Sequence, residues 1–283
     1  MSPEQVESPP SLTPLYAKAV LGGALPGGGD ELPDTTIELP ELELDRQALA
    51  EYQRVCGFRI GDTLPATYLH VRAFPLSLKL MTERDFPFAL LGLVHVANEI
   101  EQLRPLGASE RPALRVWSEN LRPHAKGRQL DMMAEAELAG EVVWRGRSTY
   151  LRPGGGSEEA GEKQQQEEPP EASAEWRVPG DIGRRYADVS GDRNPIHLNG
   201  LAAKLFGFPG AIAHGMWMKA RCLAALEGRL PAAQRVEASF KAPLKIPGKA
   251  AFGAEGDDGG WRFALLRPGG DKPHVLGSVA PLR

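Results

Sequence analysis

The sequence predicts an α+β fold built twice, with a buried helix followed by strands in each half. A low-complexity stretch divides the chain near its middle, and the same landmark residues recur in the same order on both sides of it. In each half an apolar, helix-like segment comes before several strand-like segments. Helices that are followed by antiparallel strands are typical of α+β proteins. We therefore expect two domains of similar design.

The dividing stretch spans residues 153–175. It begins with Pro-Gly-Gly-Gly and continues with Ser, Glu, Gln, Lys, Pro and Ala, almost without large apolar side chains. A segment of this composition cannot bury enough apolar surface to fold, so it predicts a flexible linker. The expected domains are 35–152 and 176–283, and an N-terminal arm at residues 1–34 precedes them.

Two landmarks recur in both halves: a tyrosine followed five residues later by a glycine, and a Phe-Pro dipeptide. The segment after each Phe-Pro is apolar around most of its circumference, which predicts buried helices at 88–103 and 210–226. The landmarks are Tyr52, Gly57 and Phe86-Pro87 in the first half, and Tyr186, Gly191 and Phe208-Pro209 in the second.

Strand-like segments follow each expected helix. Val236, Ala238 and Phe240 alternate with other residues and would share one face of a sheet. The expected strands are 114–117, 131–138 and 141–151 in the first half, and 235–240, 261–266 and 275–279 in the second.

Composition excludes several classes of protein. Lys and Arg number 33 against 37 Asp and Glu, a net charge of -4 that does not indicate nucleic-acid binding. The two cysteines, Cys56 and Cys222, do not indicate a disulfide framework, and the acidic, polar N-terminus is not a signal peptide, so we expect a cytoplasmic protein. The sequence contains no run of 18 apolar residues, so we expect no membrane span and no membrane partner.

The most informative motif is Tyr-Ala-Asp-Val-Ser-Gly-Asp-Arg-Asn-Pro-Ile-His at residues 186–197. Asp192 and His197 lie on either side of Pro195, which disfavours a helical conformation at the preceding residue, Asn194. An isolated Asp and His in a loop are more often a turn cap and a surface histidine. The residues that follow favour a site instead.

Those residues predict helices around a turn. A helix can begin near His197 and run to Phe206, with Gly207 as its end. Beyond it, Gly215 lies near the start of an apolar helix-like segment. An acid–base pair beside a helix N-terminus is suited to adding water to an activated double bond, because the exposed N–H groups stabilise developing negative charge.

The motif resembles the signature of the (R)-specific enoyl-CoA hydratases, also known as hydratase 2 or the MaoC-like dehydratase family. That signature is an aromatic residue, then Ser-Gly-Asp-x-Asn-Pro-Ile-His, then Gly-Phe, then Ile-Ala-His-Gly-Met. The resemblance is strong in the C-terminal half and covers the N-terminal half in outline. The matching residues are Tyr186, Ser190, Gly191, Asp192, Asn194, Pro195, Ile196, His197, Gly207, Phe208, Ile212, Ala213, His214, Gly215 and Met216.

The resemblance implies a tandem, or double, hotdog fold, in which each half is a curved antiparallel sheet wrapped round a central helix. It also implies a role for each site residue. Asp192 and His197 would bind one water as the acid–base pair, and the Gly215 N–H would donate to the thioester oxygen. Asn194 would orient the site through its amide. Ser190 and His214 are candidate substrate-binding residues, although their side chains can equally satisfy buried backbone groups.

The implied reaction is reversible hydration of a trans-2-enoyl thioester to the (3R)-hydroxyacyl thioester in fatty acid metabolism, without a metal or redox cofactor. The acyl carrier would be CoA or acyl carrier protein, and a homodimer is compatible with the pattern. Lys241, Lys245 and Lys249 would either contact carrier phosphates or form an ordinary solvated face.

The N-terminal half lacks the acid–base motif. Phe58 follows Gly57, where Asp192 follows Gly191 in the other half, and no Asn-Pro-x-His occurs there. We therefore expect one active site per chain, with the N-terminal half degenerate. His70 and His95 fit cap or core histidines better than site residues.

Three other functions stay open. A hotdog thioesterase would need an acid on its central helix, but the expected helices carry none in their first two turns, and Glu99 and Glu101 come late. A non-catalytic acyl-thioester-binding protein would not need the Asp192 and His197 pair. A metal-dependent hydrolase would use these two residues with His214, in a spacing that matches no common zinc pattern.

Overall fold

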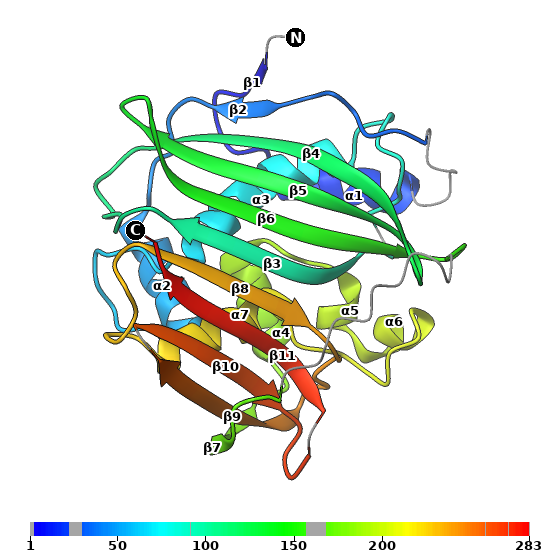
Figure 1. Ribbon diagram of the computed structural model, residues 1–283. Coiled ribbons are helices and arrows are strands. Elements are labelled where there is room, and N and C mark those ends of the chain that lie inside the picture. The colour runs from blue at the N-terminus through cyan, green and yellow to red at the C-terminus, as the bar shows by residue number, and fades with distance from the viewer. Residues whose placement is uncertain are drawn as a thin grey trace. The chain divides into compact units, whose positions relative to one another are not determined.

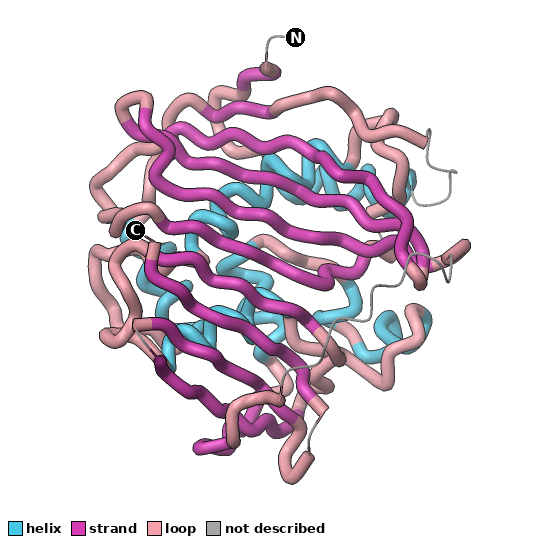
Figure 2. The backbone as a smooth tube through the Cα atoms, viewed as in Figure 1, coloured by secondary structure: helices cyan, strands magenta, loops and turns pink. Residues whose placement is uncertain are grey.

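The computed structural model describes residues 3–22, 30–90, 92–156, 168–257, 259–270 and 272–282. The chain folds into two compact units, which Figures 1 and 2 show as helices and antiparallel sheets. The first unit comprises Met1–Glu43, Leu69–Asn98 and Arg111–Gln166, and the second comprises Leu44–Tyr68, Glu99–Glu110 and Glu167–Arg283. Two segments of the N-terminal half therefore belong to the second unit.

The strands of the first unit follow the order β1-β2-β4-β5-β6-β3, and β3 continues past Asn98 into residues that belong to the second unit. The pairs β2–β4, β4–β5 and β5–β6 are antiparallel, whereas β1 and β2 are parallel. The three strands expected in this half are confirmed, as β4, β5 and β6. The bounds are β1 Glu4–Gln5, β2 Ile37–Leu39, β3 Val94–Gln102, β4 Ala113–His124, β5 Gly127–Leu138 and β6 Glu141–Pro153.

The helices of the first unit are α1 (Leu12–Gly22) and α3 (Tyr68–Met81), whose first residue belongs to the second unit. Leu76, Leu78 and Leu80 of α3 are fully buried, and α3 lies behind the sheet in Figure 1. α3 is therefore the central helix of this unit.

The helix expected at 88–103 is wrong, because most of this segment is the strand β3. Its buried residues alternate with period two, but two of them, Asn98 and Gln102, are polar and concealed the strand pattern. The buried Asn98 amide is satisfied across the sheet: its Nδ2 donates to the Arg147 carbonyl at 3.2 Å and to Ser148 Oγ at 3.1 Å. No local pattern indicated α3, since proline usually interrupts a helix and Pro75 lies inside it.

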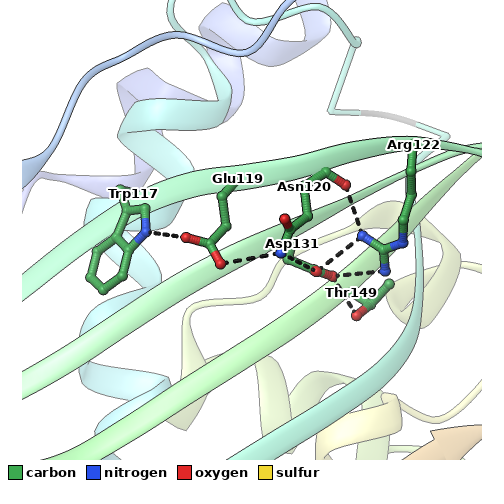
Figure 3. Close-up of polar contacts among 6 residues, drawn as sticks. All are labelled: Trp117, Glu119, Asn120, Arg122, Asp131 and Thr149. Atoms are coloured by element: carbon green, nitrogen blue, oxygen red, sulfur yellow. Dashed lines mark hydrogen bonds and ion pairs between the residues drawn. The ribbon is translucent and has the colours of Figure 1, made fainter.

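A buried carboxylate stabilises a bulge in this sheet (Figure 3). The register between β4 and β5 shifts after Glu119, where Asn120 adopts a left-handed φ of 56°. Asp131 accepts from both terminal nitrogens of Arg122 at 3.0 and 3.2 Å, from Thr149 Oγ1 at 2.6 Å and from Asn120 Nδ2 at 3.3 Å. A buried charge is tolerated when it is paired and hydrogen-bonded. These contacts therefore explain why the Asp131 carboxylate can be buried at the bulge.

The sheet of the second unit has the strand order β8-β11-β10-β9-β7. All of its neighbouring pairs are antiparallel. The three strands expected here are confirmed, as β8, β10 and β11, whereas β9 was missed because glycine and alanine dominate its sequence. The bounds are β7 Ala172–Val178, β8 Gln234–Phe240, β9 Gly248–Asp257, β10 Gly260–Leu266 and β11 Pro273–Pro281.

The central helix of the second unit is α7 (Gly215–Ala225), which confirms a buried helix within 210–226. Lys219 of α7 is fully buried and donates from Nζ to the Val236 carbonyl of β8 at 3.0 Å. One helix against an antiparallel sheet in each unit is the arrangement expected for a double hotdog.

The repeated tyrosine–glycine landmark marks two corresponding helices, α2 (Arg46–Cys56) and α4 (Ile182–Ser190), both in the second unit. Each ends at a left-handed glycine: Gly57 has φ 84° and Gly191 has φ 75°. The rings of Tyr52 and Tyr186 lie 6.3 Å apart between these helices. A helix from the N-terminal half thus supports the helix that leads into the Asp192 motif.

The expected arm and linker are partly ordered. α1 and β1 lie within residues 1–34, and Glu4 of β1 pairs with Ile37 of β2. β7 begins at Ala172, inside the stretch expected as linker, and residues 157–167 of that stretch lie outside the described residues. Among the residues that the structure describes, no helix is long and apolar enough to span a membrane.

Candidate active site

Asp192 lies in the turn that follows α4. Gly191 ends the helix in the left-handed conformation, which reverses the chain before the acid. The Asp192 N–H donates to Ser190 Oγ at 3.2 Å, and Asp192 Oδ1 accepts from the Asn194 N–H at 3.2 Å. Ser190 is buried, so it supports the turn from within, and the Asp192 side chain remains about one-third exposed.

His197 lies on α5 (Pro195–Leu198), a single turn of helix. Asn194 caps this turn by accepting from the Ile196 N–H at 3.3 Å, and Pro195 occupies its first position, where its missing N–H costs nothing. Asn194 therefore orients the site through its amide oxygen, acting on the backbone that carries the histidine.

The tautomer of His197 follows from its hydrogen bond. Its Nδ1 lies 2.9 Å from the Ile212 carbonyl oxygen, which can only accept, so Nδ1 carries the proton and Nε2 keeps its lone pair. Burial lowers the pKa of His197, and the Asp192 carboxylate and the bond to Ile212 oppose this shift only in part. A neutral imidazole with a free Nε2 is suited to accepting a proton.

The single helix expected from His197 to Phe206 is divided in two. α5 ends at Leu198, and α6 spans Gly200–Leu205. The break has a clear cause, since Asn199 is extended and its Oδ1 accepts from the N–H groups of Leu201 and Ala202 at 2.8 and 3.2 Å. The new cap starts a second helix in another direction.

His214 connects the parts of the site. Its Nε2 lies 2.9 Å from the Asp192 backbone oxygen and 3.8 Å from Asp192 Oδ2. Its ring stacks on His197 with centroids 3.7 Å apart, and the Tyr186 ring lies 4.9 Å away on α4. Burial, followed by the neighbouring His197, lowers the pKa of His214 to about 3. Neutral His214 thus donates from Nε2–H and positions the acid.

Gly215 is the first residue of α7, and His214 is its N-cap. The first N–H groups of a helix have no partner within the helix, so Gly215 presents a donor at the positive end of the dipole. A Cβ at this position would lie 3.1 Å from three ring atoms of Phe240, closer than ordinary contact. A larger residue here would therefore have to displace the Phe240 ring of β8 or the start of α7.

Three polar groups converge beside this N-terminus. Asp192, His197 and His214 each contribute one carboxylate or imidazole atom, and these atoms lie within 4.8 Å of one another. The same three residues could be considered as metal ligands. In this cluster the two rings stack at 27°, and His197 Nδ1 and His214 Nε2 each lie 2.9 Å from a backbone carbonyl oxygen, so one nitrogen of each imidazole is already engaged. The geometry favours acid–base chemistry.

The sequence analysis missed several residues that support the candidate site. A Cβ on Gly183 of α4 would lie 2.0 Å from the His197 carbonyl oxygen, so this glycine allows α4 to pack directly against α5. A glycine inside a helical pattern was the available signal. Phe240 and Tyr52 gave none, because their contacts with Gly215 and Tyr186 join distant parts of the sequence.

The other residues that the sequence singled out do not belong to the cluster of Asp192, His197 and His214. Lys241 and Lys245 are exposed, and Lys249 forms an ion pair with Glu175 at 2.8 Å. His70 and His95 lie in the first unit, in a stack with Tyr150: the His70 and His95 centroids are 6.0 Å apart, and those of His95 and Tyr150 are 4.7 Å apart.

Comparisons with known proteins agree with this geometry. Residues 161–254 match the MaoC like domain. The chain is 38% identical over 265 residues to 3-hydroxyacyl-thioester dehydratase X of Mycobacterium tuberculosis, covering 92% of this chain and 95% of that protein. A crystal structure of HtdX from the same organism superposes with a TM-score of 0.78, at 38% identity, and covers 87% of this chain and 99% of that one.

A shorter match lies with the 3-hydroxybutyryl-CoA dehydratase of Methylorubrum extorquens. The two are 40% identical over 65 residues, which is 22% of this chain and 41% of that protein. The agreement with the Mycobacterium tuberculosis protein extends over both units, whereas the domain match covers mainly the second. Together with the site geometry, these similarities show that the chain belongs to the MaoC-like dehydratase family.

Proposed function

We propose that the protein is a hydro-lyase that adds water reversibly to trans-2-enoyl thioesters and forms (3R)-hydroxyacyl thioesters. The observation that carries the proposal is the convergence of Asp192, His197 and His214 within 4.8 Å, next to the helix that Gly215 begins. The names of the relatives, a 3-hydroxyacyl-thioester dehydratase and a 3-hydroxybutyryl-CoA dehydratase, support the same reaction in fatty acid metabolism.

The mechanism uses neutral His197 as the base. A water held between Asp192 and His197 attacks Cβ of the enoyl group, and His197 Nε2 takes one of its protons. The π electrons of the double bond move toward the thioester oxygen, and the negative charge there is stabilised by the Gly215 N–H. Loss of one such donor typically reduces the rate by about 10²–10³. The proton that His197 has taken is then returned to Cα, which completes the addition of one water and restores the neutral imidazole.

The roles of the other residues follow from their contacts. Asn194 orients α5, Ser190 supports the turn beneath Asp192, and His214 positions Asp192 through its backbone oxygen. No step requires a metal or a redox cofactor. Whether His214 also contacts the substrate, whether the enzyme is a cytoplasmic homodimer, and whether it acts on CoA or carrier-protein thioesters stay predictions.

Thioester hydrolysis is the second candidate function. A hotdog thioesterase needs an acid on its central helix to direct water to the carbonyl carbon. Neither α3 nor α7 contains an aspartate or glutamate. Glu99 and Glu101, which seemed to lie on a central helix, lie on β3, and Arg235 donates to Glu101 at 2.6 Å. The helix composition therefore favours the hydro-lyase.

One assay separates the two functions and reads the stereochemistry. Trans-2-enoyl-CoA is incubated with the protein while the enoyl-thioester absorbance and free thiol are recorded together. We expect the absorbance to fall without thiol release, and the product to resist a dehydrogenase specific for (3S)-hydroxyacyl-CoA. Thiol release in step with substrate loss would indicate a thioesterase, and oxidation of the product would contradict the (3R) assignment.

A further inference from the structure

An apolar face on α6 has no role in the reaction. Exposed large apolar side chains are few among the described residues, and half of them fall within 201–206. Leu201 is 75% exposed, Leu205 is 88% exposed and Phe206 is 42% exposed. Leu201 and Leu205 are four residues apart in α6 and therefore lie on one side of the helix. Grouped apolar residues of this kind usually mark an interaction site.

One cation lies on this helix and a second lies beside the segment that follows it. Lys204 is exposed between the two leucines in α6, and Lys245 is exposed on the segment that pairs with Ile212. Neither lysine forms an ion pair within the described ranges of the chain. The carbon chain of Lys245 lies against Gly210, at 3.4 Å from the position of a Cβ there. In a chain with a net charge of -4, this is a local positive and apolar surface.

The same short segment connects this surface to the candidate site. Asn199 ends α5, which carries His197, and its side chain begins α6. After α6, the Phe208 N–H donates to the Ala203 carbonyl at 3.0 Å, and the chain continues to Ile212, whose carbonyl accepts from His197. A macromolecule bound to α6 would therefore be anchored close to the residues that perform the reaction.

We propose that Leu201, Lys204, Leu205, Phe206 and Lys245 form a docking surface for an acyl carrier protein, which delivers the enoyl thioester to this site. The inference rests on the proposed function and names its carrier. A carrier protein is acidic and presents apolar and carboxylate side chains around its phosphopantetheine arm, which complements leucines and free lysines. CoA phosphates could use the lysines but would leave the outward leucines uncovered.

Carrier choice can be measured with one acyl chain on two carriers. The same trans-2-enoyl group is supplied on CoA and on a purified acyl carrier protein, to the wild type and to Leu205→Glu and Lys204→Glu. We expect both variants to lose at least about tenfold in kcat/KM for the carrier-protein thioester, and to stay within about twofold of wild type on CoA. Ile60→Glu is the matched control, since Ile60 is 58% exposed in the segment that follows α2, and we expect no change on either carrier.

Direct binding keeps this inference separate from the proposed function. Fluorescently labelled carrier protein bearing its phosphopantetheine arm is titrated with each variant, and we expect affinity to fall with rising salt and in both α6 variants. Equal losses on both carriers, or unchanged carrier-protein kinetics and binding, would overturn the docking surface. Concentration-dependent self-association that Leu205→Glu abolishes would assign it to a second copy instead. Turnover of neither thioester by wild type would contradict the proposed function, and the titration alone would then decide the docking.

Discussion

His214 determines much of the geometry at the scale of single residues. One imidazole donates to the Asp192 backbone, stacks on His197 and precedes the first residue of α7. Its Nδ1 is buried and accepts no hydrogen bond from the described residues, so protonation there would bury a charged N–H group without an acceptor. This explains why the pKa of His214 falls to about 3.

Stability should therefore depend on pH through His214. Its ordinary pKa is 6.5, so between pH 6.5 and about 3 the unfolded chain binds a proton that the folded chain does not. The contribution of neutral His214 to the free energy of unfolding is fully present above pH 6.5. It is lost as the pH falls, by up to about 1.4 kcal/mol per pH unit. Urea unfolding at pH 7 and pH 5 should show a smaller loss for His214→Gln than for wild type. Equal losses would mean that His214 titrates normally.

Gly215 tests the oxyanion assignment. In Gly215→Ala the new methyl group would meet Phe240 at 3.1 Å, so the ring or the start of α7 must move. We expect kcat to fall by at least about tenfold, part of the 10²–10³ typical for losing an oxyanion donor. Gly200→Ala is the control, because its Cβ would make ordinary contact at 3.7 Å. Equal activity in the two variants would argue against the Gly215 N–H as donor.

At the scale of elements, local sequence patterns predicted those strands and helices whose own residues carry a clear periodicity. The strands with apolar alternation and the helix α7 were expected from sequence, and the motif residues Asp192 and His197 do converge. β3 was mistaken for a helix because buried Asn98 and Gln102 replaced the apolar residues of its alternation. α2 comes from the N-terminal half of the sequence but belongs to the second unit. This placement depends on packing between residues far apart in the sequence, which no local pattern reports.

The corresponding helix ends offer a matched pair of substitutions. Gly191 and Gly57 both adopt left-handed conformations, which cost other residues about 1–2 kcal/mol. Gly191→Ala and Gly57→Ala should lower the free energy of unfolding by similar amounts in urea titrations. Only Gly191→Ala should also reduce kcat, because it precedes Asp192. A comparable loss of activity in Gly57→Ala would show that the turn at Gly191 has no special role.

At the scale of the whole molecule, the two halves of the sequence differ in the motif that follows the shared glycine. The N-terminal half continues from Gly57 to Phe58, whereas the C-terminal half carries Asp192 and the capped turns of α5 and α6. Each unit keeps a central helix against an antiparallel sheet, and the described acid–base cluster lies in the second unit. We therefore expect one active site per chain, in a protein whose two units share one fold.

The most direct measurement is hydration of trans-2-enoyl-CoA by wild type and Asp192→Asn. The amide oxygen can still accept from the Asn194 N–H, so the turn should keep its structure and the melting temperature should stay close to that of wild type. We predict that kcat/KM falls by about 10²–10⁴, the contribution of a positioned acid or base. A variant that folds and hydrates within twofold of wild type would contradict the assignment of this site.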